Sequence, residues 1–576
     1  MSAATESPPR TLRDWSGTIE VAAVAAAASV IGITNEFVND DIHLIANNVR
    51  VQSMTNWHDW FALPFWPPPF SPDLYRPLTS ALLAFEYTLG NGAPMVFRIG
   101  SYLVYALVCL AVFALCRRMM PRPFALAAAV LFAAHPVHVE AVALAVGQSE
   151  LVVGLLAVVM CIRYIDRRRA SALGPRDWAI FVALYLIAAL TKEQGLILPA
   201  LLVAAELCLF PGTWRERARA LLPVLLSMAV VAAGILVVRY RVLGGVGGTF
   251  PAEALIGVGI GGRILTMLAM VPQWTRLFLW PYHLRADYSP QEFVASTGFG
   301  FAEAAGLVIL VAVTVSAWQL RRRAPGFTFG IAWCAIALLP VANVFVVTGI
   351  MLAERTLFLP SMGLVIAILS LAHAAAAAEP ETRMLPFVHH EHWKRRATLA
   401  FNVIALLGVL RSVERQRVWQ NEGTFVVRGV QNSPRSFRMQ RAYGDLLFDL
   451  EQPALAFAAY DRAMQYSPPS QVWRVHNDLA TTLMRKGDFV RQAEHLAISL
   501  RQNPEQEFRR GQLVAAYTML GEYSQAAAQA DSGLAHGAKQ ETFGRMKVVL
   551  DSAVRVHAPA GSIKVGVEPG TFSAVR

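Results

Sequence analysis

Two adjacent carboxylates, Asp40 and Asp41, follow the first long apolar run of the chain. That run, residues 19–38, is long enough as a helix to cross a bilayer. Ionisable groups at a membrane boundary are costly unless water, a partner or a substrate compensates them. The pair is therefore a candidate for catalysis or binding, although a solvated helix end would also explain it.

Further ionisable groups interrupt or flank the later apolar runs. A carboxylate at such a place can act as a general base towards a hydroxyl, and basic groups can stabilise charge on a departing phosphate. This chemistry suits a polyprenyl-phosphate sugar, whose tail needs the bilayer and whose phosphate needs cations. The groups are Arg76, the cluster His135, His138 and Glu140, the pair Lys192 and Glu193, and the pair Glu354 and Arg355.

The composition is that of a polytopic membrane protein, with 55% hydrophobic and 16% charged residues. The formal charge of +11 comes from short basic clusters between apolar runs, where they would set topology, so we expect no nucleic acid partner. All five cysteines lie inside apolar runs without metal-ligand or disulfide spacing. Residues 1–15 and the run behind them predict an uncleaved first span.

Apolar runs of spanning or near-spanning length predict roughly eleven crossings. If the spans alternate, every basic cluster falls on one side, which the positive-inside rule makes cytoplasmic, and the candidate site residues fall on the other. The stretch 264–283 is interrupted by prolines, Gln273 and Arg276, so we interpret 241–298 as an outer loop whose helices lie on or dip into the membrane. The runs are 19–38, 96–116, 124–143, 146–162, 178–191, 194–211, 220–238, 300–319, 327–349, 355–376 and 397–411.

Residues 39–95 form the first large outer loop, whose aromatic residues and prolines are typical of helices anchored at the lipid headgroups. From about Val418 the chain becomes charged and repeats with the 34-residue period of tetratricopeptide hairpins. Gly487-Asp488-Phe489 recurs as Gly521-Glu522-Tyr523, and an earlier unit fits through Gly444, Ala456, Tyr460, Ala463 and Pro468.

The predicted fold is all-α: a multi-span transmembrane domain over 1–417, an extracytoplasmic tetratricopeptide α-solenoid of about three repeats over 418–557, and a disordered tail over 558–576. The His389, His390 and His392 group falls on the cytoplasmic side and is interpreted as a solvated loop.

Several short motifs of this chain, and their order along the sequence, resemble those of the TMTC family of transmembrane O-mannosyltransferases with tetratricopeptide repeats. The resemblance implies a GT-C type membrane glycosyltransferase that uses a dolichyl- or undecaprenyl-type phosphate sugar on the luminal or periplasmic face. The family's eukaryotic members transfer mannose to Ser/Thr of extracellular proteins. The motifs are Asp40-Asp41, Tyr75-Arg76-Pro77-Leu78, the segment 135–141, Lys192-Glu193-Gln194, Ala286-Asp287-Tyr288-Ser289, and Ala353-Glu354-Arg355 with 359–363.

The resemblance also implies roles for single residues. Asp40 matches the catalytic base, and Asp41 its acidic neighbour. Arg76, Lys192 and Arg355 are candidates for the donor phosphate, and Glu140, Glu193 and Glu354 for orienting those cations. Two features depart from the family pattern: Gln148 stands where members often have arginine, and the repeat array is short.

Several alternatives remain open from the sequence. If the protein is a glycosyltransferase, its acceptor is either a polypeptide held in the tetratricopeptide groove or an envelope lipid or polysaccharide. A non-catalytic scaffold and a transporter are alternative functions, because both would also span the membrane. Lys192 and Glu193 could form a structural ion pair. His135, His138 and Glu140 could bind a divalent cation, but their spacing is not that of a closed metal site, and no metal is assigned. Direct displacement with one base would invert the anomeric carbon.

The setting predicted is a bacterial inner membrane, with the site and the repeats in the periplasm and lipids around the spans. In a eukaryotic cell the same topology would place both in the lumen of the endoplasmic reticulum.

Overall fold

The computed structural model describes residues 12–68, 70, 73–170, 173–245, 251–377, 390–568 and 571–575. The chain forms two compact units. The first, called the membrane unit, comprises residues 1–67, 72–285 and 295–425. The second, called the C-terminal module, comprises residues 68–71, 286–294 and 426–576.

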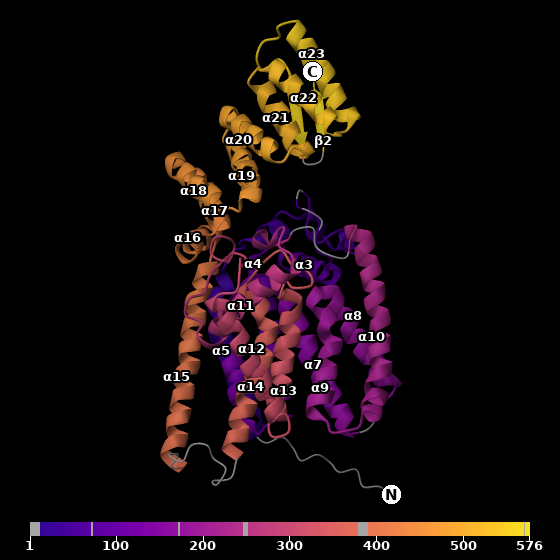
Figure 1. Cartoon of the computed structure of the whole chain (residues 1–576), viewed down its shortest axis with the longest axis vertical. Helices are drawn as coiled ribbons and strands as arrows, with labels where there is room; N and C mark the ends of the chain where they lie inside the picture. The colour runs from indigo at the N-terminus through magenta and orange to yellow at the C-terminus, as the bar shows by residue number, and fades with distance from the viewer. Residues whose placement is uncertain are drawn as a thin grey trace. The chain divides into compact units, whose positions relative to one another are not determined.

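The membrane unit is a bundle in which the long helices run side by side (Figure 1). Each predicted apolar run contains helix. The helices are α1 (Leu12–Ser29), α2 (Trp57–Ala62), α3 (Pro77–Gly90), α4 (Pro94–Cys116), α5 (Arg122–Ala134), α6 (Val139–Ala143), α7 (Gln148–Ala170), α8 (Pro175–Thr191), α9 (Leu198–Leu209), α10 (Trp214–Leu243), α11 (Ile260–Leu279), α12 (Phe301–Leu320), α13 (Pro325–Leu338), α14 (Phe358–Ala377) and α15 (His390–Gln416).

Seven helical segments among the described residues are long and apolar enough to cross a membrane, or eight if the bent pair α5 and α6 forms one span. The expected eleven crossings stay a prediction, because this test rests on helix length and composition alone. The three predicted crossings that do not meet the test contain α8, α9 and α13, which have 17, 12 and 14 residues, and 3-10 turns adjoin α9 and α13. The 20-residue helix α11 is not among these candidate spans, and its prediction as part of an outer loop stays a prediction.

Breaks in the helices place polar residues at one end of the bundle. Pro136 ends α5, because proline has no N–H to donate and clashes with the preceding turn, and the chain bends by 49° before α6. Between α8 and α9 the chain leaves the helix at Lys192, which is extended, before a short 3-10 turn over Glu193–Ile197. Since α4 and α7 start at this end, their arginine-rich C-terminal connections lie at the opposite end.

Small residues allow close packing inside the bundle. Gly330 of α13 faces Gly363 of α14, and a Cβ atom on either would collide with the backbone of the other helix. Such contacts are typical of helix pairs in lipid, where association depends on van der Waals packing and not on burial from water. The pair supports the start of α14, which carries part of the candidate site.

The C-terminal module consists of consecutive helical hairpins. Gly487 and Gly521, both predicted turn residues, have φ of 77° and 78°, a conformation that glycine adopts without strain. Ala456, Tyr460 and Ala463 are fully buried at the predicted packing positions. The helices are α16 (Glu422–Asn432, which crosses the boundary between the units), α17 (Phe437–Asp449), α18 (Pro453–Tyr466), α19 (Val472–Arg485), α20 (Phe489–Gln502), α21 (Glu507–Met519), α22 (Tyr523–Ala535) and α23 (Arg545–Arg555).

Segment 286–294, from the second outer loop, belongs to this module. The Phe437 amide donates to the Pro290 carbonyl at 3.1 Å, and the Gln291 amide donates to the Arg435 carbonyl at 2.8 Å. The Asp287 carboxylate accepts a hydrogen bond of 2.6 Å from Ser436, the N-cap residue of α17. Asp287, part of a motif that carried the family resemblance, thus anchors the first hairpin.

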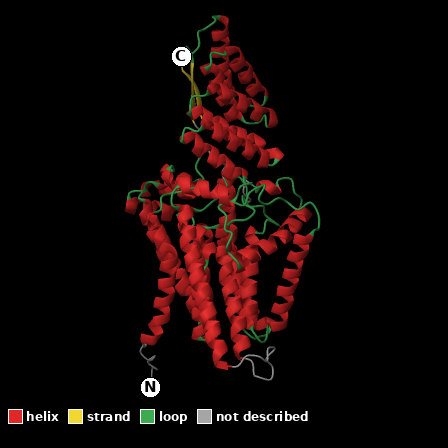
Figure 2. Cartoon of the chain, turned by 90° about the vertical axis from the view of Figure 1, so that its left-hand side faces the viewer, coloured by secondary structure: helices red, strands yellow, loops and turns green. Residues whose placement is uncertain are grey.

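The described part of the tail differs from its predicted disorder. The strands β1 (Lys564–Glu568) and β2 (Thr571–Val575) pair in antiparallel register, and the rest of the described chain is helical or loop (Figure 2). The physical reason lies in the sequence, where Val565 and Val567 alternate with other residues in β1, and Phe572 and Val575 add residues that favour strands in β2. His389 lies outside the described residues, as do the side chains of His390 and His392.

Candidate active site

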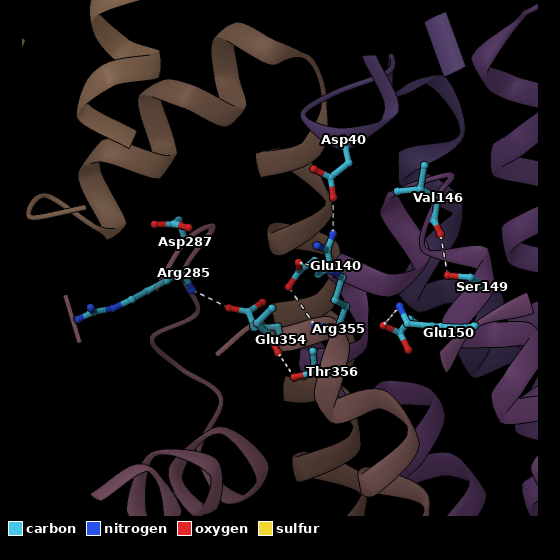
Figure 3. Close-up of polar contacts among 12 residues, drawn as sticks. Asp40, Glu140, Val146, Ser149, Glu150, Arg285, Asp287, Glu354, Arg355 and Thr356 are labelled. Carbon is cyan, nitrogen blue, oxygen red and sulfur yellow. Dashed lines mark hydrogen bonds and ion pairs between the residues drawn. The ribbon is translucent and has the colours of Figure 1, made fainter. Parts of the chain in front are cut away.

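Asp40 forms an ion pair with Arg355 at the start of α14. The distance from Asp40 Oδ2 to Arg355 Nη1 is 2.8 Å, and the two side chains are 21% and 20% exposed. Arg355 is held from its other side by Glu140, which accepts a hydrogen bond of 3.0 Å from the Arg355 amide and lies 3.5 Å from Nε (Figure 3). Asp40 is thus oriented, partly open to solvent and able to accept a proton.

Asp41 lies behind Asp40 and anchors the same loop. Its fully buried carboxylate accepts hydrogen bonds of 2.9 and 3.0 Å from the amides of Ala145 and Val146, and Arg98 lies 3.4 Å away. Burial raises the pKa of Asp41, while Arg98 and the two amides act in the opposite direction. Because its carboxylate is enclosed, Asp41 fits a positioning role beside Asp40 and not a direct role in proton transfer.

Lys192 contacts a carboxylate that the sequence did not single out. Its Nζ lies 2.5 Å from Glu150 Oε1, so the alternative of a Lys192–Glu193 ion pair is wrong. Burial lowers the pKa of Lys192 to about 8, although Glu150 favours the protonated form. The side chain thus titrates near neutral pH, as functional lysines often do.

Glu193 instead binds two arginines. Arg76 donates from Nε and Nη2 at 2.9 and 2.7 Å, and Arg239 donates from Nη1 at 2.9 Å. Burial alone would raise the pKa of Glu193, but Arg76 and Arg239 outweigh it and hold the pKa at about 2. Glu193 therefore holds the side chains of Arg76 and Arg239 on its carboxylate.

These groups form one charge cluster. Lys192 interacts electrostatically with Arg76 and Arg355, and Arg355 interacts with Glu150. The cluster contains the cations Arg76, Lys192, Arg239 and Arg355 and the carboxylates of Asp40, Glu140, Glu150 and Glu193. The carboxylates hold the four partly buried cations in place, so an additional anion would meet cations that are already oriented.

His135 and His138 are engaged in hydrogen bonds. Nδ1 of His135 accepts from the Val137 amide at 3.2 Å, and its Nε2 donates to the Phe278 carbonyl at 2.9 Å, which defines a neutral ring. The nitrogens of His138 lie 3.1 Å from the Tyr105 hydroxyl and 2.8 Å from the Ser361 hydroxyl. Within the described residues, no group of three or more His, Cys, Asp or Glu could hold a metal ion. The two rings hold the α5–α6 bend in place.

Glu354, directly before Arg355, binds residues from two distant parts of the chain. Its carboxylate accepts a hydrogen bond of 2.6 Å from the Arg285 amide and lies 3.2 Å from Arg415. Both ionic side chains are fully buried. The carboxylate therefore joins the start of α14 to α15 and to the end of the second outer loop.

The sequence interpretation missed Arg98, Glu150, Arg239 and Arg415. All four lie within or at the edge of apolar runs, and an ionisable residue in such a run is itself a functional signal. Gln148, which departs from the family pattern, donates to both oxygens of Glu86 at 3.0 and 2.9 Å. Burial raises the pKa of Glu86 to about 8.

Fold and site together define an all-α polytopic membrane protein with a charge cluster at one end of its bundle. The sequence is 23% identical to protein O-mannosyl-transferase F38B6.6 of Caenorhabditis elegans over 72% of this chain and 57% of that protein. It is 24% identical to protein O-mannosyl-transferase TMTC3 of Mus musculus, with 74% and 48% covered, and 25% identical to TMTC4 of Homo sapiens, with 79% and 66% covered. These matches support membership of the TMTC-type family, as the motifs predicted.

The chain spans about half to two thirds of the length of these curated relatives. No family model matches the sequence, and no solved structure matches it.

Proposed function

We propose that this protein is a membrane glycosyltransferase that moves a hexose, specifically mannose, from a polyprenyl phosphate to an acceptor hydroxyl. The accessible Asp40–Arg355 pair within a cluster of partly buried cations is the observation that carries the proposal. The names of the relatives support mannose as the sugar and a protein as the acceptor. The acceptor is then a Ser or Thr hydroxyl on the extracytoplasmic face.

In the proposed reaction, Asp40 accepts the proton of the acceptor hydroxyl while its oxygen bonds to the anomeric carbon. The bond from that carbon to the phosphate oxygen breaks, and polyprenyl phosphate leaves with its electron pair. Attack from the side opposite the leaving group inverts the anomeric carbon, as in other single displacements at a sugar. Asp40 matches this role because it is held by one arginine yet remains partly exposed.

The leaving group gains one negative charge when the phosphodiester becomes a monoester. Arg76, Lys192 and Arg355 are proposed to stabilise that charge, with Arg239 as a fourth cation. Cations that are already oriented do not have to reorganise as charge develops, so their effect on the transition state is large. Glu140, Glu150 and Glu193 keep them in place through the contacts described above.

In this proposal the membrane unit is a GT-C type transmembrane domain, and the C-terminal module is a tetratricopeptide module that presents the acceptor polypeptide. The arginine-rich connections favour a cytoplasmic side opposite the site, so that Asp40 faces the periplasm or lumen. A non-catalytic scaffold would need the helical hairpins but not a partly exposed carboxylate bound to arginine at the membrane boundary.

The test is transfer of radiolabelled mannose from polyprenyl-phosphate mannose in membranes that contain the wild-type chain or Asp40→Asn at equal expression. We expect label in protein with the wild type and none with Asp40→Asn, because an amide cannot accept the proton. Asp59→Asn, a change in the same outer loop but outside the charge cluster, is the matched control and should transfer normally. Equal transfer by wild type and Asp40→Asn would refute the proposed base, and no transfer by either would favour another donor or the scaffold.

A further inference from the structure

The residue directly before Asp40 is held by the end of the membrane unit. Asn39 has a φ of 52°, a left-handed conformation that asparagine tolerates better than most residues. Its amide donates a hydrogen bond of 2.8 Å to Glu422 Oε2. The backbone turn from which Asp40 projects is therefore fixed by a carboxylate 383 residues later in the sequence.

This contact is part of a longer pairing. The Glu36 amide donates to the Gln420 carbonyl at 2.9 Å, and Asn35 Nδ2 donates to the Gln416 carbonyl at 3.1 Å. Trp419 is fully buried, and the centroids of its ring and the Phe425 ring lie 4.9 Å apart. Residues 416–422, called the strap, thus run beside residues 35–39 and end at the residue that binds Asn39.

A second contact holds the residue directly before Arg355, the partner of Asp40. Glu354 accepts from the Arg285 amide at 2.6 Å, while Arg415 Nη2 donates to the Arg285 carbonyl at 2.7 Å. Figure 3 shows the contact between Arg285 and Glu354. With the Arg415 contact, the Arg285 peptide groups are bound on both sides. Asp40 follows Asn39 and Arg355 follows Glu354, and each of these preceding residues is bound to a distant part of the chain.

The two distant parts are places where the chain passes from the membrane unit to the C-terminal module. Glu422 is the first residue of α16, and this one helix continues across the boundary at Phe425 to Asn432. Arg285 is followed directly by Ala286, the first residue of the segment that belongs to the module. Displacement of either connection would therefore be transmitted by covalent structure to Glu422 or to Arg285.

We propose that Glu422 and Glu354 are positioning residues through which the C-terminal module sets the geometry of the Asp40–Arg355 pair. The inference rests on the proposed function, since it treats Asp40 as the base. A general base must lie within hydrogen-bond reach of the proton it accepts, and a misplacement of about 1 Å can cost about a hundredfold in rate. The module thereby affects the chemical step as well as acceptor capture.

The test uses the full chain with Glu422→Ala, which removes the acceptor for the Asn39 amide, and Glu422→Gln, which keeps an oxygen there. Glu505→Ala, the loss of an exposed carboxylate in the same module, is the matched control. We expect Glu422→Ala to lower kcat about ten- to a hundredfold with little change in the KM for the donor. Glu422→Gln and Glu505→Ala should stay within about twofold of the wild type, because the hydrogen bond is retained or was never involved.

Hydrogen–deuterium exchange of residues 36–42 provides a readout that does not depend on activity. Exchange there should rise in Glu422→Ala and remain as in the wild type in Glu422→Gln. An unchanged kcat together with unchanged exchange in Glu422→Ala would overturn the inference, as would faster exchange over all helices, which would indicate general destabilisation. Activity in Asp40→Asn would instead refute the proposed base, while the exchange result would still report on the Asn39 contact.

Discussion

The lowered pKa of Lys192 predicts how the rate of sugar transfer depends on pH. Burial lowers its pKa from 10.5 to about 8, so the cation is present below that pH and lost above it. At about pH 9, one unit higher, only about a tenth of the molecules keep the charge. Since the proposed reaction uses Lys192 as a cation, kcat/KM should fall about tenfold per pH unit above about 8.

Lys192→Arg tests this explanation. A guanidinium stays protonated throughout the accessible pH range, so the alkaline decline in kcat/KM should move up by a unit or more, even if the larger side chain lowers the maximal rate. Lys539→Arg, at an exposed position in the C-terminal module, is the control and should leave the profile unchanged. The assay is the initial rate of mannose transfer at low donor concentration across the pH series.

An alkaline decline at the same pH in Lys192→Arg would show that another group controls it. A profile that rises through about pH 8 would contradict the sign of the argument, because it would mean that the neutral amine is the active form. Either outcome would remove Lys192 from the proposed donor site.

Two further predictions concern stability and metal. Arg98→Met removes the guanidinium that lies 3.4 Å from the fully buried Asp41, and breaking a buried pair costs about 3–5 kcal/mol, so thermal unfolding in detergent should begin at a clearly lower temperature; an unchanged unfolding temperature would mean that the two amides alone satisfy Asp41. A strong chelator should leave the transfer rate unchanged, because the ring nitrogens of His135 and His138 already form hydrogen bonds. If the chelator abolished activity and added Mn²⁺ or Mg²⁺ restored it, the prediction that transfer needs no metal ion would be wrong.

The sequence predicted which residues would gather but often not which of them would pair. Asp40, Arg76, Lys192, Glu193 and Arg355 were chosen because each is ionisable beside an apolar run, and all five lie in one cluster. Their partners were missed: Lys192 binds Glu150, and Glu193 binds Arg76 and Arg239. The separation of two residues along the sequence does not indicate whether they pair, because the residues of this cluster come from different helices.

What the sequence by itself determined was the class of the protein: long apolar runs that require helices in lipid, repeated hairpins at the C-terminus, and ionisable groups within or beside the runs. Only the tertiary structure decided that Asp40 is accessible while its neighbour Asp41 is enclosed, and that Glu354 and Glu422 hold the chain beside the Asp40–Arg355 pair. The reason is physical. Hydrophobicity and helix length act locally and can be recognised from neighbouring residues, whereas the burial and pairing of a charge depend on which distant segments pack around it.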